Sequence, residues 1–126
     1  MVNAVKAAQA AARQAQESMY FGVATVYEYQ KTVDENHLST EQEVAVLERQ
    51  PCRLAFGSKS QAVQSENGNK ISQTIKLFLA PDVEVKPGSK ITVTQDGVTN
   101  DYANSGVPAV YPTHQEIVLE LFERWA

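Results

Sequence analysis

Residues able to carry acid–base, nucleophilic or metal chemistry are few in this chain, and they are not gathered in a spaced motif. The two histidines, His37 and His114, stand in neither an HExxH motif nor another ligand spacing. The single cysteine, Cys52, lies where apolar residues alternate along a strand-like segment, which is typical of a buried small hydrophobe and not of a nucleophile. One cysteine can neither form an internal disulfide nor complete a Cys-based metal site within the chain. We therefore interpret both histidines as surface or strand-end residues and Cys52 as a core residue.

The carboxylates fit structural positions better than catalytic ones. Asp82, Asp96 and Asp101 belong to turns or strand edges. The last predicted strand carries a further set of charged residues: Glu116, Glu120, Glu123 and Arg124. Such a set is most often a solvated face. No phosphate-cradling glycine loop is present in the sequence. We expect no catalytic residue, no metal ligand and no bound cofactor, and hence a protein that acts by shape and assembly and not as an enzyme.

Length and composition favour one folded domain over residues 1–126. A chain of this length can bury about two thirds of its unfolded surface, and its share of hydrophobic residues, 43%, excludes a disordered chain. No run approaches the stretch of about 20 apolar residues that a membrane span needs. The N-terminus lacks the apolar centre of a signal peptide, so we expect the protein to be made and kept in a cytoplasm. The formal net charge of −4 argues against a basic patch for nucleic acid, although DNA could still pass the protein.

Residues 1–20 hold the predicted N-terminal helix, which we place at residues 3–19. The segment combines a possible Asn3 cap with alanine, glutamine, lysine and arginine, and no glycine or proline interrupts it. Its apolar stripe is made mostly of small residues at helical spacing: Val5, Ala8, Ala12, Ala15 and Met19. Such a stripe suits close approach to another surface. Either the helix lies across one end of the domain or it docks on another subunit.

The remaining residues, 22–126, are organised around Asp96-Gly97, a dipeptide typical of a two-residue β-hairpin whose turn residues both take positive φ. This turn predicts that Gln95 lies opposite Val98 and that Ile91 lies opposite Tyr102. One face of the pair should then be dry: Ile91, Val93, Val98 and Tyr102. The other should be wet: Thr92, Thr94, Thr99 and Asp101. Even spacing of apolar residues predicts a further strand upstream: Ile71, Ile75, Leu77 and Leu79.

Further strands are predicted on both sides of this hairpin. Residues 23–33 are rich in β-branched and aromatic side chains, a polar turn follows at residues 34–37, and residues 43–56 form one strand broken at Pro51 or two short ones. Residues 114–126 are apolar on both faces, and in this context they indicate a strand buried between layers. The expected fold class is mainly β, with one N-terminal α-helix.

Two segments lack a hydrophobic pattern and are predicted as exposed, irregular chain. Residues 57–69 (GSKSQAVQSENGN) are the longer one, and a loop of that length in a small domain is either functional or a plain surface excursion. Residues 105–113 (SGVPAVYPT) are held extended by Pro108 and Pro112.

Several pieces of the chain together resemble a known protein family. They are the alanine-rich N-terminal helix, VATVYEYQKT, ERQPCRLAF, KLFLAPDVEVKPGSKITVTQDG and the terminal NSGVPAVYPTHQEIVLELFERWA, which is the most specific part. Over nearly its whole length the chain resembles the small head-tail connector proteins of tailed phages and prophages of Gram-positive bacteria. It is similar to the head-closure, or stopper, group and to the related minor capsid and head-tail joining proteins. The mainly helical adaptor group fits least.

The resemblance implies a small antiparallel β-barrel with an added helix and long loops. It also implies a virion protein, made in the bacterial host cytoplasm and assembled at the head-tail interface as a homo-oligomeric ring beneath the portal and its adaptor. Such a ring retains packaged double-stranded DNA and offers a platform to the tail proteins, and no membrane contact is implied. The number of subunits, and whether the isolated chain is a monomer, stay open.

By analogy with the stopper group, we expect the 57–69 loop to project into the channel and change conformation when DNA arrives or leaves. The candidate gating residues are Ser58, Lys59, Gln61, Gln64, Glu66, Asn67 and Gly68. The candidate inter-subunit docking residues are Val5, Ala8, Ala12, Val107, Val110 and Tyr111.

Two other functions are considered. The first is a tail-terminator or tail-completion protein, which would form a ring at the end of the tail tube. The second is a cytoplasmic β-barrel module that binds a small ligand or peptide through aromatic side chains. Its candidate contacts are Tyr27, Tyr29, Tyr102, Tyr111 and Trp125, although core or rim packing is the simpler interpretation of most of them.

Overall fold

The computed structural model describes residues 2–65 and 68–125, and the side chains of residues 3–57 and 74–125. One helix, α1 (Val2–Glu17), precedes the strands. The strands are β1 (Gly22–Val33), β2 (Ser39–Ser65), β3 (Gly68–Leu79), β4 (Lys90–Gln95), β5 (Val98–Asn104), β6 (Ala109–Val110) and β7 (Gln115–Leu121). The fold is mainly β with a single N-terminal helix among these residues, as the sequence predicted.

The strands form a ring of antiparallel hydrogen-bonded pairs. The order β3-β2-β1-β4-β5-β7 is closed by a further pairing between β3 and β7, and the short β6 pairs with β7 outside this ring. The interior of the ring holds the core, with its fully buried centre formed by Val26, Cys52, Leu77, Leu79, Ile91, Val93 and Ile117. Closure matters because a small sheet that closes on itself leaves few free edges in its wall.

The β4–β5 hairpin has the predicted register. Gln95 lies opposite Val98 and Ile91 lies opposite Tyr102, and the turn residues Asp96 and Gly97 have φ values of 53° and 76°. On the wet face, hydrogen bonds join opposite side chains of Thr92 and Asp101, and of Thr94 and Thr99. The dry face is buried except at Val98, which is 58% exposed because the hairpin passes beyond the core there.

Strand β2 runs continuously through Pro51, whereas the sequence predicted either one strand broken at Pro51 or two short ones. Its first half pairs with β1 as far as Cys52, and from Cys52 onward it pairs with β3. A bulge precedes the change of partner, where Arg49 takes a positive φ of 51° and the register shifts. Proline is tolerated at this place because the strand is leaving β1 and giving up that ladder.

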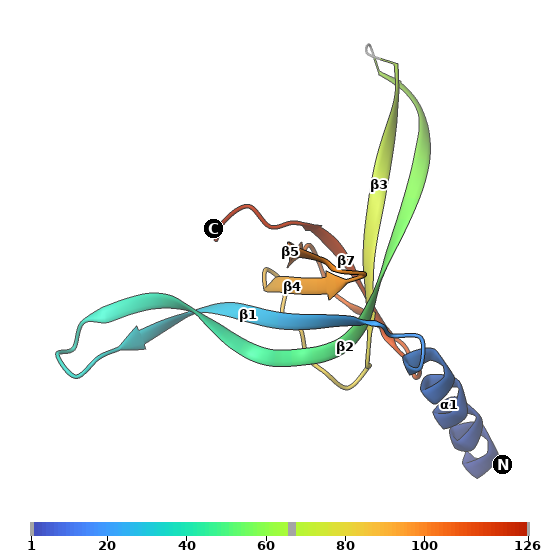
Figure 1. The fold of residues 1–126 in the computed structure, drawn as a ribbon, viewed down its shortest axis with the longest axis horizontal. Coiled ribbons are helices and arrows are strands. Elements are labelled where there is room, and N and C mark those ends of the chain that lie inside the picture. Colours follow the sequence, from blue (N-terminus) through green and yellow to red (C-terminus); the bar gives the residue numbers. More distant parts are fainter. Residues whose placement is uncertain (1, 66–67, 126) are drawn as a thin grey trace.

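Two arms extend from the ring because the strands are longer than the ring is deep (Figure 1). The first arm, residues 28–44, is the end of the β1–β2 hairpin, since β1 pairs with β4 only up to Tyr27. The second arm, residues 57–74, is the end of the β2–β3 hairpin, since β3 pairs with β7 only from Ile75 onward. The arms point in different directions.

The prediction of a loop at residues 57–69 was wrong. Residues 57–65 complete β2 and residues 68–69 begin β3, so the described part of this segment is a ladder. The apolar alternation that indicates a strand arises when one face covers a core, and this arm runs beyond the core. The expected long loop is therefore a long hairpin.

The last strand is shorter and less buried than predicted. Strand β7 begins at Gln115 and ends at Leu121. Ile117 and Leu119 face the core, but Val118 on the opposite face is 48% exposed, so β7 is covered on one face and not buried between layers. Residues 105–113 are irregular as expected, apart from the two-residue β6.

Helix α1 does not lie across an end of the ring. Residues 3–12 are exposed all round, and Figure 1 shows the helix projecting from the ring. It is held at its C-terminal end, where Arg13 bonds to Glu17 at 2.9 Å and to Asp82 at 3.0 Å beside a cavity of about 440 Å³. An isolated helix of this length is marginal in water, so it gains stability if another surface covers it.

Candidate functional site

The residues singled out for chemistry are held in structural roles. Cys52 is fully buried, and burial raises the pKa of its thiol to about 12, so the thiol stays protonated and unreactive near neutral pH. This confirms the interpretation of Cys52 as a core residue. His37 lies in the turn of the first arm with φ 60°. Within the described residues, no group of three or more histidine, cysteine, aspartate or glutamate residues could hold a metal ion.

His114 belongs to a small polar and aromatic cluster at the start of β7. Its Nε2 lies 2.9 Å from Glu116 Oε2, and its Nδ1 lies 2.9 Å from the Thr113 hydroxyl. Its ring stacks on Tyr111 and also faces Phe78. The hydrogen bond from His114 is the main reason that the pKa of Glu116 is lowered, and Lys76 at 3.5 Å adds to it. The cluster joins β7 to β3 and resembles no catalytic arrangement.

The candidate gating residues that the structure describes fall on the second arm. Ser58, Lys59, Gln61 and Gln64 lie on β2, and Gly68 is the first residue of β3. The register places Gln64 opposite Asn69 and Ser65 opposite Gly68, near the far end of the arm. Glu66 and Asn67 lie outside the described residues. The fold therefore gathers the described members on one projecting hairpin.

The candidate docking residues form two separate exposed groups. Val5, Ala8 and Ala12 lie on the exposed part of α1, and Val5 is 58% exposed. Val107, Val110 and Tyr111 are exposed on the segment that leads into β7. The two groups are linked only through a series of contacts. Tyr111 stacks on His114, and the His114 ring faces Phe78. Phe78 in turn lines a small pocket with Met19 and Tyr20, just after α1.

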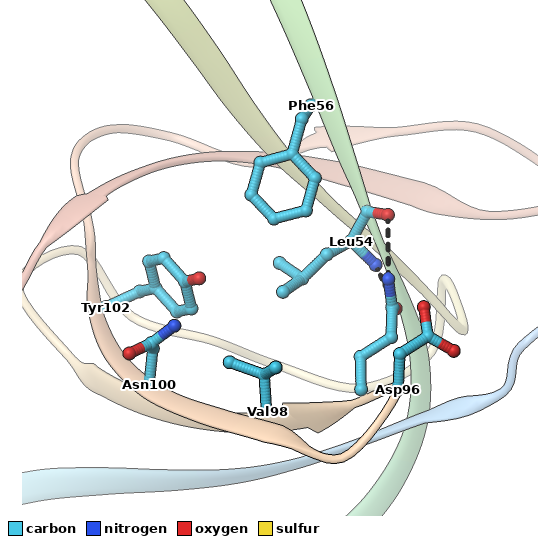
Figure 2. A pocket seen from close by; sticks show the side chains of 7 residues that line it. Leu54, Phe56, Asp96, Val98, Asn100 and Tyr102 are labelled. Atoms are coloured by element: carbon cyan, nitrogen blue, oxygen red, sulfur yellow. Dashed lines mark hydrogen bonds between the residues drawn. The ribbon is translucent and has the colours of Figure 1, made fainter.

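A pocket at one mouth of the ring was not predicted from the sequence. Its volume is about 200 Å³, and Leu54 and Phe56 on β2 face Val98 and Tyr102 on β5 across it (Figure 2). Small-molecule sites usually enclose about 300–1,000 Å³. This pocket therefore has the size of a site for one apolar side chain.

Gln95 closes the base of this mouth. Beyond Cys52, β2 no longer pairs with β1, and the backbone N–H of Leu54 donates instead to Gln95 Oε1 at 2.8 Å. The Gln95 amide donates in return to the Leu54 carbonyl at 3.3 Å. One side chain thus replaces a strand neighbour at the point where the edge of β2 becomes free. No local pattern could reveal this, because the two residues are 41 positions apart.

The aromatic residues considered for a binding module have partners within the chain. Tyr102 is part of the core, Tyr29 stacks on Trp125, Tyr111 stacks on His114, and Lys90 lies over Tyr27. This agrees with the packing interpretation.

The contact between Tyr29 and Trp125 ties the C-terminal segment to the root of the first arm. Glu43 supports it, since its Oε1 accepts from Lys90 at 2.8 Å and from the Trp125 indole at 3.3 Å.

None of the helices in the described part of the chain is long and apolar enough to cross a membrane. Comparison with known proteins gives little further guidance. No protein-family model matches the chain. No curated protein matches it either. A solved structure similar to it is the phage-like element PBSX protein xkdH from Bacillus subtilis, with a TM-score of 0.48, 12% sequence identity, and coverage of 79% of this chain and 91% of that one. At that TM-score and identity, the likeness carries no argument about family, partners or activity.

Proposed function

We propose that this protein is a structural component of a phage head-tail connector, and that it forms the head-closure ring that retains packaged DNA and receives the tail. The observation that carries the proposal is the pair of long arms and the exposed helix that project from a small closed ring. A two-stranded hairpin and a short helix are each marginal alone in water. Such elements suit a subunit that is completed by its neighbours.

The sequence resemblance supports the same proposal independently of the geometry. It points to connector proteins, and it covers the helix, the β1 and β2 segments, the β3–β4 region and the C-terminal segment. In the proposed ring, the far end of the second arm reaches the channel and meets the DNA, with the portal or adaptor on one side and tail proteins on the other.

The proposal is tested by deleting the gene from its inducible phage and examining the lysate by negative-stain electron microscopy beside the wild type. We expect heads that have lost their DNA, accompanied by separate tails. DNA-filled heads beside irregular or overlong tails would place the protein at the tail terminus instead. Intact virions would contradict a connector role altogether.

The role of the second arm has a test of its own. Removing residues 61–70 and joining Ser60 to Ile71 through a two-residue Asn-Gly turn shortens the arm while keeping the register of the remaining ladder. We expect the ring of strands to keep its unfolding free energy, because the arm lies beyond the core, and the filled heads to leak DNA. Normal retention of DNA by heads carrying the shortened protein would contradict a gating role for the arm.

A further inference from the structure

The two arms carry opposite charge, although the whole chain has a formal net charge of only −4. The first arm, residues 28–44, holds one lysine against five carboxylates: Glu28, Asp34, Glu35, Glu41 and Glu43. The segment that forms the second arm and its root, residues 53–78, holds one carboxylate against four cations: Arg53, Lys59, Lys70 and Lys76. The charge difference follows the fold, because the acidic set lies on the first arm, whereas Lys59 and Lys70 lie on the second arm and Arg53 and Lys76 lie in the ring at its root.

Most of the acidic charge on the first arm has no ion-pair partner among the described side chains. Glu43 bonds to Lys90, but within the described side chains no ion pair involves Glu28, Asp34, Glu35 or Glu41. The Asp34 carboxylate instead accepts the backbone N–H groups of Asn36 and Leu38 and so shapes the turn. Apart from Glu41, which lies opposite Lys31 in the ladder, these carboxylates present negative charge that the described side chains leave uncompensated.

The first arm also exposes apolar side chains between these charges. Val33 is 67% exposed, Leu38 is 62% exposed and Tyr29 is 44% exposed. Beyond Tyr27, β1 has no second neighbour among the described strands, so its outer edge is free there. A free strand edge with apolar side chains and one sign of charge is a surface suited to another strand of opposite charge.

The sign of the charge decides which strand of another copy could dock on the free edge of the first arm. Two first arms placed side by side would bring carboxylates together, and like charges across an interface are unfavourable. We propose that the first arm of one copy docks along the second arm of the next copy, between its root and its far end. The inference rests on the proposed function, because it supplies the contact between neighbouring subunits of the ring.

The proposed contact joins two different surfaces, so it is heterologous. A heterologous contact repeats from copy to copy and closes into a ring when the rotation between copies allows it. The divergence of the two arms suits this arrangement, because each copy can receive a neighbour on one side while reaching the other neighbour with its first arm (Figure 1).

The experiment reverses the charge of one arm at a time and then recombines the variants. The acidic-arm variant carries Glu35→Lys and Glu41→Lys, and the basic-arm variant carries Lys59→Glu and Lys70→Glu. By formal charge, the first pair of substitutions brings the first arm from −4 to 0, and the second pair brings residues 53–78 from +3 to −1. Neither variant alone therefore keeps two arms of opposite sign, whereas a mixture still offers the unchanged first arm of one variant to the unchanged second arm of the other. Self-association is followed by sedimentation velocity at low and high salt. The protein concentration is raised to about 1 mM, because a contact of about 4 kcal/mol is half populated there.

Matched controls reverse the same number of charges away from the arms. Glu84→Lys with Glu120→Lys controls for the acidic-arm variant, since both residues are exposed and lie outside the arms. Lys86→Glu with Arg124→Glu does the same for the basic-arm variant, since both residues are exposed and lie outside the arms and α1. Circular dichroism and unfolding curves establish that all four proteins are folded.

We expect wild-type association to weaken at high salt and each arm variant to associate about tenfold more weakly than its control, as two or three lost ion pairs would give. In the mixture, the contact between the two unchanged arms of unlike variants should recover the wild-type affinity. Three results would each overturn the proposal: no association of the wild type at low salt, arm variants equal to their controls, or a mixture that stays dissociated. If any of them occurs while the gene deletion still yields emptied heads, the arm contact is wrong and the proposed function stands.

Discussion

The ring and the arms are made from the same three strands, β1, β2 and β3, but their surroundings differ. Inside the ring β1 and β3 have a neighbour on each edge, and β2 pairs first with β1 and then with β3. One face of these strands covers a core in which Leu77 is fully buried. Along the arms each strand has one neighbour, and side chains such as Val33 on the first arm are largely exposed. The ring is stabilised by contacts within the chain, whereas the arms expose the surface that other molecules could cover.

The largest expected effect comes from opening a cavity in the ring. Leu77→Ala should lower the free energy of unfolding by about 2–5 kcal/mol, because the side chain is fully buried and its neighbours cannot close the space. Val33→Ala on the first arm is the matched change and should alter it by less than about 0.5 kcal/mol. Urea unfolding followed by circular dichroism measures both. Equal effects would mean that the arm is part of the cooperative core.

A smaller effect is expected where the ring ends and the second arm begins. Gln95→Ala removes the acceptor of the Leu54 N–H and should lower the free energy of unfolding by about 1–3 kcal/mol. Gln95→Glu keeps that acceptor but loses the donor to the Leu54 carbonyl and places a negative charge beside that oxygen, so it should also be less stable than the wild type. The alanine variant being as stable as the wild type would show that water replaces the amide.

Two equivalent threonine pairs allow a direct comparison of arm and ring. Thr32 and Thr40 share a hydroxyl hydrogen bond at 3.0 Å on the first arm, and Thr94 and Thr99 share one at 2.8 Å on the β4–β5 hairpin. Thr94→Val should lower the free energy of global unfolding by up to about 1 kcal/mol. Thr32→Val should leave it unchanged and only speed the amide hydrogen exchange of nearby arm residues. A global loss caused by Thr32→Val would contradict the independence of the arm.

The smallest expected effect is on the pH dependence of stability in acid, and it comes from a contact in the ring. The hydrogen bond from His114 lowers the pKa of Glu116 below its ordinary value of 4.5. The ionised form therefore adds stability above that value, and this contribution is lost as the pH falls through the lower pKa of the folded state. Glu116→Gln should flatten the acid limb of a stability–pH curve by less than about 1 kcal/mol, and His114→Gln should flatten it likewise. An acid limb unchanged in both variants would exclude this contact as its cause.

Much of the fold could be predicted because it depends on short-range signals. Asp96-Gly97 set the register of β4 and β5, since a two-residue turn of that kind fixes which residues face each other. Helix α1 followed from propensity, and the burial of Cys52 followed from apolar alternation. The second arm was missed because a ladder beyond the core does not need that alternation.

The candidate site was less predictable than the fold. The gating residues were predicted on a loop, and those that the structure describes lie on a hairpin. The pocket at the mouth of the ring, with Gln95, was not predicted. Its members come from β2 and from the β4–β5 hairpin, and no sequence pattern states that these segments are neighbours. Likewise, the stacking of Tyr29 on Trp125 joins the root of the first arm to the C-terminal segment.

The sequence by itself determined the local elements: the helix, the strand-forming segments, the turn at Asp96-Gly97 and the opposite charges along two stretches of chain. The tertiary structure decided which strands pair, where the ring closes between β3 and β7, and hence that the two charged stretches become separate arms. The physical reason is that side-chain alternation tells which face of a strand is buried but not which strand lies beside it. That choice depends on contacts between residues far apart in the chain.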